Sequence, residues 1–359
     1  MASKRISIFG LGLIGGSIAK ALKNSNQSFY IQGFDKEEVT FKALKEKIID
    51  EKINSIKECL DSDIIFLCLP TELSLEYFVK ISPLIKDGKI ITDVSGVKGV
   101  FEEKWNAIES KGLYIGGHPM TGKETNGYDS ADELLFENSV YIISDAVKDK
   151  SKLDELVSVV KLLGARVRYL NPYLHDKVIS RVSHLPQLLA VSLVNAVSEN
   201  GENINYLDFA AGGFRDMTRI ASSSFNIWES VLKMNKKEIL SSIELLRENL
   251  NKIEESLQAD NYAAIEALFE KARKRRDEIP KNAKGFINPL VDVFIYVKDE
   301  PGVLSKLSTI MYKNNINIKD VELLKIREGT GGTFRTSFEN EEIAAIARRL
   351  MEEAGFKTK

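Results

Sequence analysis

The sequence predicts a doubly wound α/β sheet, followed by an all-α region and a small α+β module. Three observations support this fold class. Apolar β-type runs alternate with helical patterns up to about residue 170. From Pro172 to about Leu290 the periodicity is helical, and the remaining residues alternate again. Alternating strands and helices are typical of a mainly parallel sheet that is covered by helices on both faces.

Several of the expected strands in the first part are continuously apolar, as strands buried on both faces are. Helical patterns separate most of these strands, for example at Ile14–Lys23 and Ser151–Leu163. The expected strands are Arg5–Gly10, Phe29–Asp35, Asp63–Leu69, Lys89–Asp93, Leu113–Gly117, Val140–Ser144 and Arg166–Leu170.

The middle region is expected to be helical and to form a dimer interface. Helices of this length without a sheet to cover need apolar partners, and a second copy of the chain is the common solution. The segment Asp277–Gly285 is interpreted as a linker. The expected helices are Tyr173–Glu199, Asn226–Met234, Lys236–Leu257 and Asn261–Arg276.

The last part has the order β-α-β-β-α, which suits a small split-βαβ (ferredoxin-like) module. Its expected elements are strands Val291–Val297, Asn317–Ile326 and Thr333–Phe338 and helices Gly302–Asn314 and Glu341–Ala354. We therefore expect three domains, at residues 1–171, 172–280 and 288–359.

The composition excludes several classes of protein. The 359 residues include 50 Lys and Arg against 52 Asp and Glu, so the net charge of −2 gives no general attraction to nucleic acid or an anionic membrane. No apolar run reaches the ~18 residues of a spanning helix, and no signal peptide is apparent. Cys59 and Cys68 lack C-x-x-C spacing, so we expect reduced thiols and a cytoplasmic protein. Three histidines without matching cysteines or paired acids predict no metal site.

The segment from Ile6 to Ser17 carries the glycine fingerprint G-x-G-x-x-G of a Rossmann-type dinucleotide site. Gly10 is expected to make the tight turn, Gly12 to let the backbone approach the pyrophosphate, and Gly15 to let helix and strand pack closely. Leu13 and Ile14 open the helix whose N-terminus faces the phosphates.

An acid stands at the end of the next expected strand. Asp35 follows Gly15 by 20 residues, can accept hydrogen bonds from the adenosine ribose, and would repel a 2′-phosphate, so NAD is favoured over NADP. Leu69, Pro70 and Thr71 follow the Cys68 strand and are expected on the nicotinamide side.

Further polar motifs follow later strands or lie in the helical region. They are Ser95-Gly96-Val97-Lys98, His118-Pro-x-x-Gly-x-Glu124, Ser183-His-Leu-Pro186 and Gly212-Gly-Phe-x-Asp216-x-Thr-Arg219. In this order and approximate spacing, over about residues 5–285, the chain resembles prephenate dehydrogenases and their arogenate-using relatives. The resemblance implies NAD-dependent oxidative decarboxylation of prephenate to 4-hydroxyphenylpyruvate in tyrosine biosynthesis.

The resemblance also implies roles for individual residues. His118 would accept the proton of the ring hydroxyl, a task that suits a neutral imidazole near pH 7. Arg219 would hold the ring carboxylate, since a guanidinium binds it bidentately and keeps its charge. Asp216 would orient Arg219, and His184 would line or gate the pocket. Substrate contacts are further expected from Lys123, Glu124, Arg215 and Trp228. His175, which lies outside these motifs, is interpreted as a surface or helix-packing residue.

The chain departs from the family pattern at three positions. The family often has Gly-Ser before Val-Lys, whereas here Ser95, the candidate for bonding the substrate hydroxyl, precedes Gly96. Lys123 stands where many members have threonine, and Gln187 where a second histidine is common. These departures leave the choice between prephenate and arogenate open. Two different functions also compete with this interpretation: a β-hydroxyacid dehydrogenase, for which no catalytic lysine is apparent in the helical region, and an inactive amino-acid or NAD sensor.

The C-terminal module resembles an ACT domain, an amino-acid-sensing module. The match is Asp299-Glu-Pro-Gly302-Val-Leu after a strand and Asn315-Ile-Asn317-Ile before the next. Gly302 permits a close backbone approach at a helix start, where free N–H groups can hold a carboxylate. Asp299 would meet the ammonium group of an amino acid and Asn317 would contact the ligand. L-tyrosine is the expected effector because it is the end product of the pathway.

Overall fold

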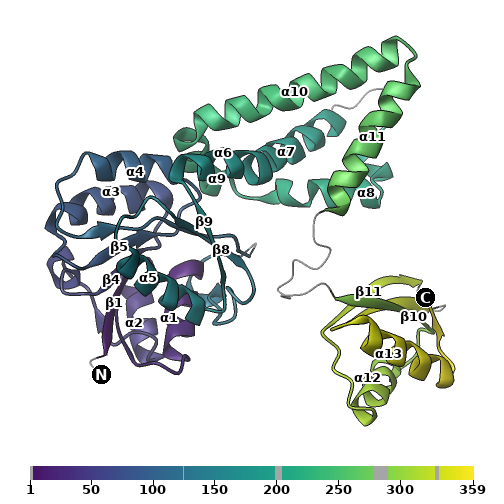
Figure 1. The fold of residues 1–359 in the computed structure, drawn as a ribbon, viewed down its shortest axis with the longest axis horizontal. Coiled ribbons are helices and arrows are strands. Elements are labelled where there is room, and N and C mark those ends of the chain that lie inside the picture. The colour runs from purple at the N-terminus through teal and green to yellow at the C-terminus, as the bar shows by residue number, and fades with distance from the viewer. Residues whose placement is uncertain (1–2, 124, 199–203, 279–289, 328–330) are drawn as a thin grey trace. The chain divides into compact units, whose positions relative to one another are not determined.

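The computed structural model describes residues 3–123, 125–198, 204–278, 290–327 and 331–359. The chain divides into two compact units, Met1–Tyr262 and Ala263–Lys359. The first unit contains two sheets and a group of helices, and the second contains one helix followed by an α+β module (Figure 1). The predicted fold class is confirmed.

The main sheet of the first unit has six parallel strands in the order β3-β2-β1-β4-β5-β6. This is the order of a doubly wound dinucleotide-binding sheet. Its strands are β1 (Lys4–Phe9), β2 (Phe29–Phe34), β3 (Glu51–Lys52), β4 (Ile64–Leu67), β5 (Ile90–Asp93) and β6 (Leu113–Tyr114). The short edge strand β3 was not predicted.

Both faces of this sheet are covered by helices, which explains the continuously apolar strands. In β4, Ile64 and Phe66 belong to one buried cluster, whereas Ile65 and Leu67 belong to the other. The first cluster includes side chains of α1 (Leu13–Lys23), α2 (Glu37–Lys45) and α5 (Lys150–Leu162). The second includes side chains of α3 (Thr71–Ile81) and α4 (Gly99–Asn106).

The expected strand Leu113–Gly117 is in fact split between two sheets. The main sheet ends with β6 at Tyr114, and β7 (Gly117–Pro119) pairs antiparallel with β8 (Val140–Ser144), which pairs parallel with β9 (Arg166–Leu170). A side chain at Gly116 would lie 2.8 Å from the Tyr114 Oη, and one at Gly117 would lie 2.8 Å from the Asp93 carbonyl oxygen. The two glycines therefore allow the chain to pass from the first sheet to the second where there is no room for side chains. As a result, His118 lies on β7 of the second sheet.

The helical part of the first unit contains α6 (Pro172–Ile179), α7 (Leu185–Ser198), α8 (Gly212–Thr218), α9 (Phe225–Met234) and α10 (Lys236–Gln258). The single helix expected over Tyr173–Glu199 is interrupted by a π-helical turn at Ser180–His184, and Glu199 lies outside the described residues. Pro186 has no N–H group and its ring collides with the preceding turn of a regular helix, so a wider turn before it relieves the clash. Helix α8 was not predicted.

The second unit begins within α11 (Tyr262–Asp277) and continues with an antiparallel sheet of order β11-β12-β10-β13. Most of the expected linker Asp277–Gly285 lies outside the described residues. The short strand β13 completes the module beyond the expected order. The elements are β10 (Val291–Val297), α12 (Val303–Lys313), β11 (Asp320–Arg327), β12 (Gly331–Phe338), α13 (Glu341–Glu353) and β13 (Lys357–Thr358).

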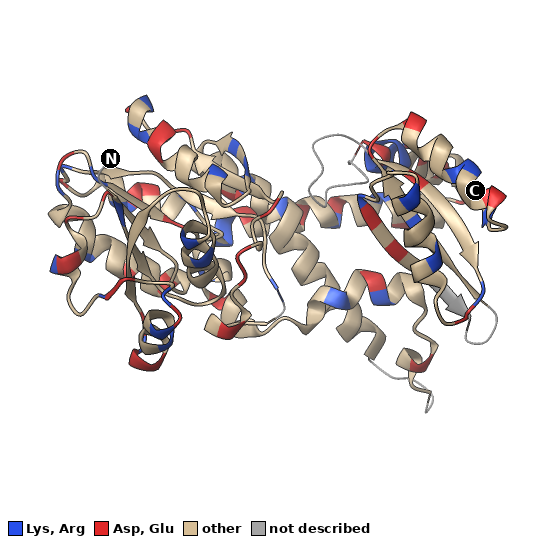
Figure 2. Ribbon diagram, turned by 90° about the horizontal axis from the view of Figure 1, so that it is seen from below, with Lys and Arg blue, Asp and Glu red and all other residues tan. Residues whose placement is uncertain are grey.

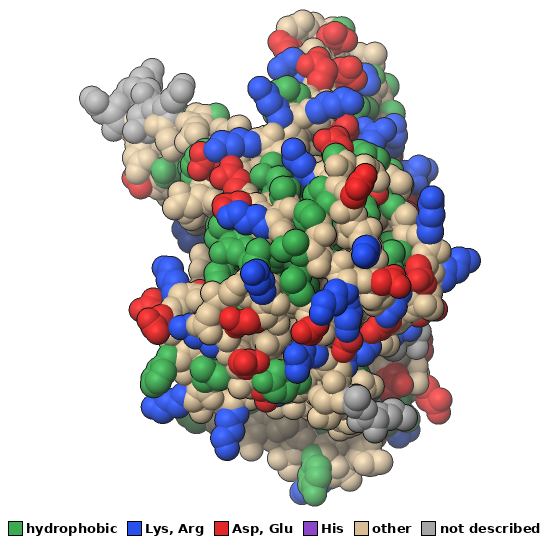
Figure 3. Space-filling model, turned by 90° about the vertical axis from the view of Figure 1, so that its left-hand side faces the viewer, with side chains coloured by type: hydrophobic (Ala, Val, Ile, Leu, Met, Phe, Trp, Pro, Cys, Tyr) green, Lys and Arg blue, Asp and Glu red, His purple; other side chains and the backbone are tan. Residues whose placement is uncertain are grey.

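Charged residues of both signs are interspersed along the helices and strands (Figure 2). The face in Figure 3 also mixes both signs around smaller groups of hydrophobic side chains, and it presents no histidine. Among the described residues, no helix is both long and apolar enough to span a membrane.

Candidate active site

The glycine-rich turn connects β1 to α1 at the carboxyl edge of the main sheet. Gly10 has φ +91°, and a side chain on it would lie 2.7 Å from the Cys68 carbonyl group. A side chain at Gly15 would overlap the Gly10 carbonyl oxygen. At Gly12, the N-cap of α1, a side chain would meet no atom within 4 Å. The space above Gly12 is therefore open beside the N-terminus of a helix, and a pyrophosphate fits there.

Asp35 follows β2 and is held against this turn. Its carboxylate accepts hydrogen bonds from the backbone N–H of Leu11 at 2.6 Å and from that of Lys36 at 2.7 Å. These bonds fix the acid beside the glycine turn, where the adenosine ribose of a dinucleotide lies in this fold. The residues present thus fit NAD.

A cleft of about 560 Å³ opens next to the glycine turn. Its lining comes from the start of α1, the segments after β4 and β5, strand β7, the π-helical turn and α9. The candidate residues that it brings together are Leu13, Ile14, Leu69, Pro70, Thr71, Ser95, His118, His184 and Trp228. Cofactor and substrate candidates from distant parts of the sequence therefore share one cavity.

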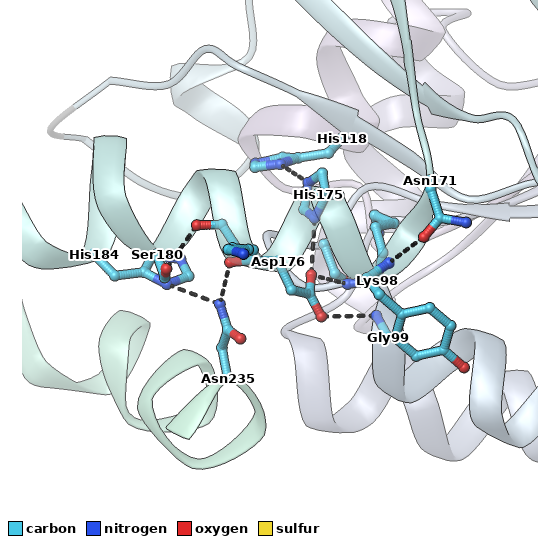
Figure 4. A network of polar contacts seen from close by, with 12 residues as sticks. Lys98, Gly99, His118, Asn171, His175, Asp176, Ser180, His184 and Asn235 are labelled. Carbon is cyan, nitrogen blue, oxygen red and sulfur yellow. Dashed lines mark hydrogen bonds and ion pairs between the residues drawn. The ribbon is translucent and has the colours of Figure 1, made fainter. Parts of the chain in front are cut away.

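The three histidines of the chain lie around this cleft and are linked by polar contacts (Figure 4). The Nδ1 of His118 lies 2.8 Å from the Nε2 of His175, and the Nδ1 of His175 lies 2.8 Å from the Asp176 Oδ1. His175 is fully buried in α6, which excludes the surface position and agrees with helix packing. Sequence reasoning missed it and Asp176 as parts of the site.

Burial keeps these imidazoles neutral. Desolvation, followed by the charges of His175, Lys98 and His184, holds the pKa of His118 well below its usual value. Desolvation also lowers the pKa of His175, and the hydrogen bond that His175 donates to Asp176 opposes this shift. It lowers the pKa of His184 to about 4. A neutral imidazole with a lone pair can accept a proton at neutral pH.

The π-helical turn places His184 between α9 and α10. Its ring meets the Trp228 ring edge-on at a centroid distance of 5.9 Å. Its Nδ1 lies 3.3 Å from the Asn235 Nδ2, which also donates to the Asp176 carbonyl oxygen at 2.9 Å. Asn235 joins α9 to α10 and was not singled out in the sequence. The sequence signal that could have identified it is an asparagine at the junction of two predicted helices.

Ser95 and Gly96 face the cleft from the segment after β5. The hydroxyl of Ser95 is buried and has no hydrogen-bond partner among the described residues. A side chain at Gly96 would begin 3.8 Å from both Cε1 and Nε2 of His118. The reversed order of these two residues therefore leaves the space beside His118 Nε2 open and keeps one hydroxyl available in the cleft.

A buried ion pair lies next to the histidines. The Lys98 ammonium contacts the Asp93 carboxylate, both side chains are almost fully buried, and Tyr114 donates to the same carboxylate at 2.9 Å. Desolvation lowers the pKa of Lys98, while Asp93 opposes that shift. Among the described residues, no group of three or more His, Cys, Asp or Glu side chains could hold a metal ion.

Other candidates lie outside the lining of this cleft. Lys123 pairs with Asp132 at 2.8 Å and lines a separate hollow. Glu124 lies outside the described residues. Arg215 and Asp216 are exposed on α8, and Arg219 is exposed in the turn that follows it. In the single chain, the structure thus brings the histidines to the cofactor turn but does not bring the arginines there.

The second unit has its own cavity, of about 230 Å³, between the end of β10, the start of α12 and the β11-β12 pair. Asp299 and Gly302 line it, and Gly302 has φ +86°. Asn317 is exposed and is not part of this lining.

The dinucleotide-binding fold and a cleft with a neutral histidine define the class of the protein, an NAD-dependent oxidoreductase. Residues 18–169 match the family model of the prephenate dehydrogenase nucleotide-binding domain, residues 171–271 that of the prephenate dehydrogenase dimerization domain, and residues 291–354 that of the ACT domain. The chain belongs to the prephenate dehydrogenase family.

Relatives match the chain over nearly its whole length. It is 37% identical to the prephenate dehydrogenase of Lactococcus lactis, over 98% of both chains, and 34% identical to that of Bacillus subtilis, over 97% of this chain and 95% of the other. Among solved structures, prephenate dehydrogenase from Aquifex aeolicus in complex with hydroxyphenyl propionate and NAD+ has a TM-score of 0.70 and 31% identity, covering 77% of this chain and 99% of that one. Synechocystis arogenate dehydrogenase has a TM-score of 0.69 and 29% identity, covering 76% and 99%.

Proposed function

We propose that the protein oxidatively decarboxylates prephenate to 4-hydroxyphenylpyruvate and CO2, with His118 as the general base. The observation that carries this proposal is the position of His118, which is neutral and lines a cleft that begins at the glycine turn. Bound NAD supplies the hydride acceptor. Gly10, Gly12, Gly15 and Asp35 would hold it, and Leu69–Thr71 would line its reacting end.

The reaction balances with one catalytic base. The ring C–H bond breaks with its electron pair leaving as hydride, and the hydroxyl proton moves to the Nε2 of His118. The bond to the ring carboxylate then breaks, its electron pair remains in the ring, and CO2 departs. The aromatic product receives the proton back on its oxygen. His118 thus holds one proton during the reaction, and Ser95 offers its unpartnered hydroxyl to the substrate oxygen.

We propose that prephenate is a better substrate than arogenate, because of the side chains that line the cleft. Arogenate carries an ammonium group on its side chain where prephenate has a ketone, and a buried charged group needs a partner of opposite charge. Among the described residues that line the cleft, none is Asp or Glu. We therefore propose prephenate as the better substrate.

The negative charges of prephenate need cations from beyond this lining. We propose that Arg219, ordered by Asp216, binds the ring carboxylate in the homodimer, with Arg215, Lys123 and Glu124 near the entrance. Arg219 follows α8 directly before α9, which lines the cleft with Trp228. Met217 and Phe225 in the same stretch are largely exposed in the single chain, as residues of a subunit interface would be.

We propose that L-tyrosine inhibits the enzyme by binding the cavity of the C-terminal module. Gly302 and the start of α12 would receive its carboxylate, Asp299 its ammonium group, and Asn317 would complete the site from a neighbouring module. The proposed compartment is the cytoplasm, since both cysteines are free thiols.

The test is NADH formation from prephenate by wild type and His118→Asn, followed at 340 nm. General-base catalysis contributes ~10²–10⁴-fold, so we expect kcat to fall by that factor while the Kd for NAD stays within about twofold. Arogenate in place of prephenate is the control for specificity. Equal rates for the two proteins would remove His118 from the mechanism, and faster turnover of arogenate would reverse the substrate assignment.

A further inference from the structure

The three histidines and their polar partners form a chain of contacts that runs through Asp176 (Figure 4). His118 and His175 lead to the Asp176 carboxylate, and His184 and Asn235 lead to the Asp176 backbone carbonyl oxygen. Apart from His118, these side chains are almost fully buried. Each link needs one donor and one acceptor. Because the roles of some atoms are fixed by chemistry, the positions of the remaining protons can be worked out.

Asp176 sets the direction of its hydrogen bond with His175. Its Oδ1 accepts from the backbone N–H of Lys98 at 2.7 Å and its Oδ2 from that of Gly99 at 2.8 Å, at the N-terminus of α4. An ionised carboxylate can only accept hydrogen bonds, and the helix N-terminus favours its negative charge. The Nδ1 of His175, 2.8 Å from the Asp176 Oδ1, must therefore carry a proton.

This proton determines the state of His118. A neutral imidazole has one N–H, so the Nε2 of His175 is bare and accepts from the Nδ1–H of His118 at 2.8 Å. The Nε2 of His118 is then bare as well. A side chain at Gly96, which lines the cleft, would begin 3.8 Å from this nitrogen, so a lone pair faces the open space.

The alternative is a charged His175 that donates from both nitrogens, which would move the proton of His118 to Nε2 and abolish its basicity there. The groups that act on His175 are Asp176 and Asp93, which favour its charge, and Lys98, which opposes it. Desolvation is the largest influence and lowers the pKa of His175, so the neutral ring prevails.

Asn235 sets the direction of the hydrogen bond to His184, at the other end of this chain of contacts. Its amide nitrogen donates to the Asp176 carbonyl oxygen at 2.9 Å, and because a carbonyl oxygen only accepts, the orientation of the amide is set. The same nitrogen lies 3.3 Å from the His184 Nδ1. That Nδ1 must therefore accept, and the proton of His184 lies on Nε2.

We propose that Asp176 and Asn235 are positioning residues that set opposite tautomers on the two histidines of the cleft. His118 presents a bare Nε2 that accepts a proton, and His184 presents an Nε2–H that donates a hydrogen bond. This inference rests on the proposed function, in which His118 is the base for the substrate hydroxyl. During the reaction His118 keeps its Nδ1–H on His175, and Asp176 stabilises the positive charge.

The direct test is ¹⁵N NMR of the full-length protein with ¹⁵N-labelled histidine. The chain has three histidines, so three ring systems are expected. Above neutral pH, wild type should show two rings protonated on Nδ1 and one on Nε2, with His118→Asn removing one of the Nδ1–H rings. A wild-type spectrum with two or more rings protonated on Nε2 would overturn the proposal, and this count of tautomers needs neither substrate nor a stable variant.

The kinetic test compares Asp176→Asn with Asn171→Ala. Asn171 caps the same helix, α6, through a bond to the Tyr173 N–H but takes no part in the chain of histidines. We expect Asp176→Asn to change the tautomers, lower kcat by about 10²-fold or more and shift the acidic limb of the kcat/KM profile to lower pH, since an imidazolium loses its counter-charge. Asn171→Ala should keep the tautomers and the profile.

Two failures can be told apart. If wild type is inactive with prephenate but has the expected tautomers, the proposed function fails and the positioning role stands. If Asp176→Asn lowers the rate by one factor at every pH and keeps all three tautomers, Asp176 is only structural and the positioning role fails.

Discussion

Replacing Asp93 by Asn should destabilise the first unit strongly, because the buried Lys98 ammonium group then loses its carboxylate partner. Asp93 is fully buried and Lys98 is 3% exposed. Removing one partner of a buried pair costs about 3–5 kcal/mol, because the remaining charge has lost its compensation. At about 2–4 °C per kcal/mol for a unit of this size, the Tm should fall by roughly 6–20 °C.

The loss of stability in Asp93→Asn should depend on pH, and the pKa shift of Lys98 determines the sign of this dependence. Burial lowers the pKa of folded Lys98, and Asp93 opposes that shift. Without Asp93 the folded pKa drops further below the ~10.4 of an unfolded chain, so the unfolded state binds more protons between the two values. The free energy of unfolding then rises with pH, because stability increases wherever the unfolded state binds more protons.

Scanning calorimetry at about pH 7 and about pH 9.5, at one fixed protein concentration, measures both effects. The decrease in Tm of Asp93→Asn relative to wild type should be larger at the lower pH and smaller at the higher pH. Glu76→Gln, which removes an exposed partner of Lys80, is the matched control and should leave the Tm unchanged. An Asp93→Asn protein that melts with wild type, or whose deficit is the same at both pH values, would refute the reasoning.

Four further predictions concern the cleft, the assembly and the C-terminal module. Arg219→Ala should raise the KM for prephenate, because about 2–5 kcal/mol of binding free energy is lost. The control Arg247→Ala should leave this KM unchanged, and an unchanged KM in Arg219→Ala would contradict the assignment. Asp35→Ser should raise kcat/KM for NADP relative to NAD, and a constant ratio would exclude a role in cofactor choice. Light scattering should give about twice 40.3 kDa, and a monomeric mass would contradict the homodimer. Asp299→Ala should abolish inhibition by tyrosine at unchanged kcat, and persistent inhibition would place the effector elsewhere.

The cofactor side of the site could be predicted because its signals are local in sequence. The glycines, the helix that they open and the acid 20 residues after Gly15 all follow from one strand-turn-helix-strand unit. The structure places them where the spacing predicts, since the order of a parallel sheet brings successive strand ends to one edge.

The histidine chain could not be predicted in the same way, because its links are tertiary. His175 stands in α6, 57 residues from His118. Asp176 follows it and is 78 and 77 residues from Lys98 and Gly99, whose N–H groups it binds. The split of the expected strand Leu113–Gly117 had the same origin, since the Lys98 atom that crowds Gly116 and the Asp93 atom that crowds Gly117 are neighbours only in the folded chain. The π-helical turn that precedes Pro186 likewise lies inside an uninterrupted helical pattern.

The apolar lining of the cleft links substrate binding to assembly. Among the described residues that line it, none is Lys or Arg, yet prephenate carries two carboxylates, and a buried carboxylate without a partner costs far more than a hydrogen bond returns. The cations must therefore come from segments that reach the cleft only from its margin. The stretch with Arg215 and Arg219 is exposed and bordered by exposed Phe209, Met217 and Phe225. Dimerisation that covers these apolar side chains would order the same stretch, so we infer that substrate affinity is gained when the subunits associate.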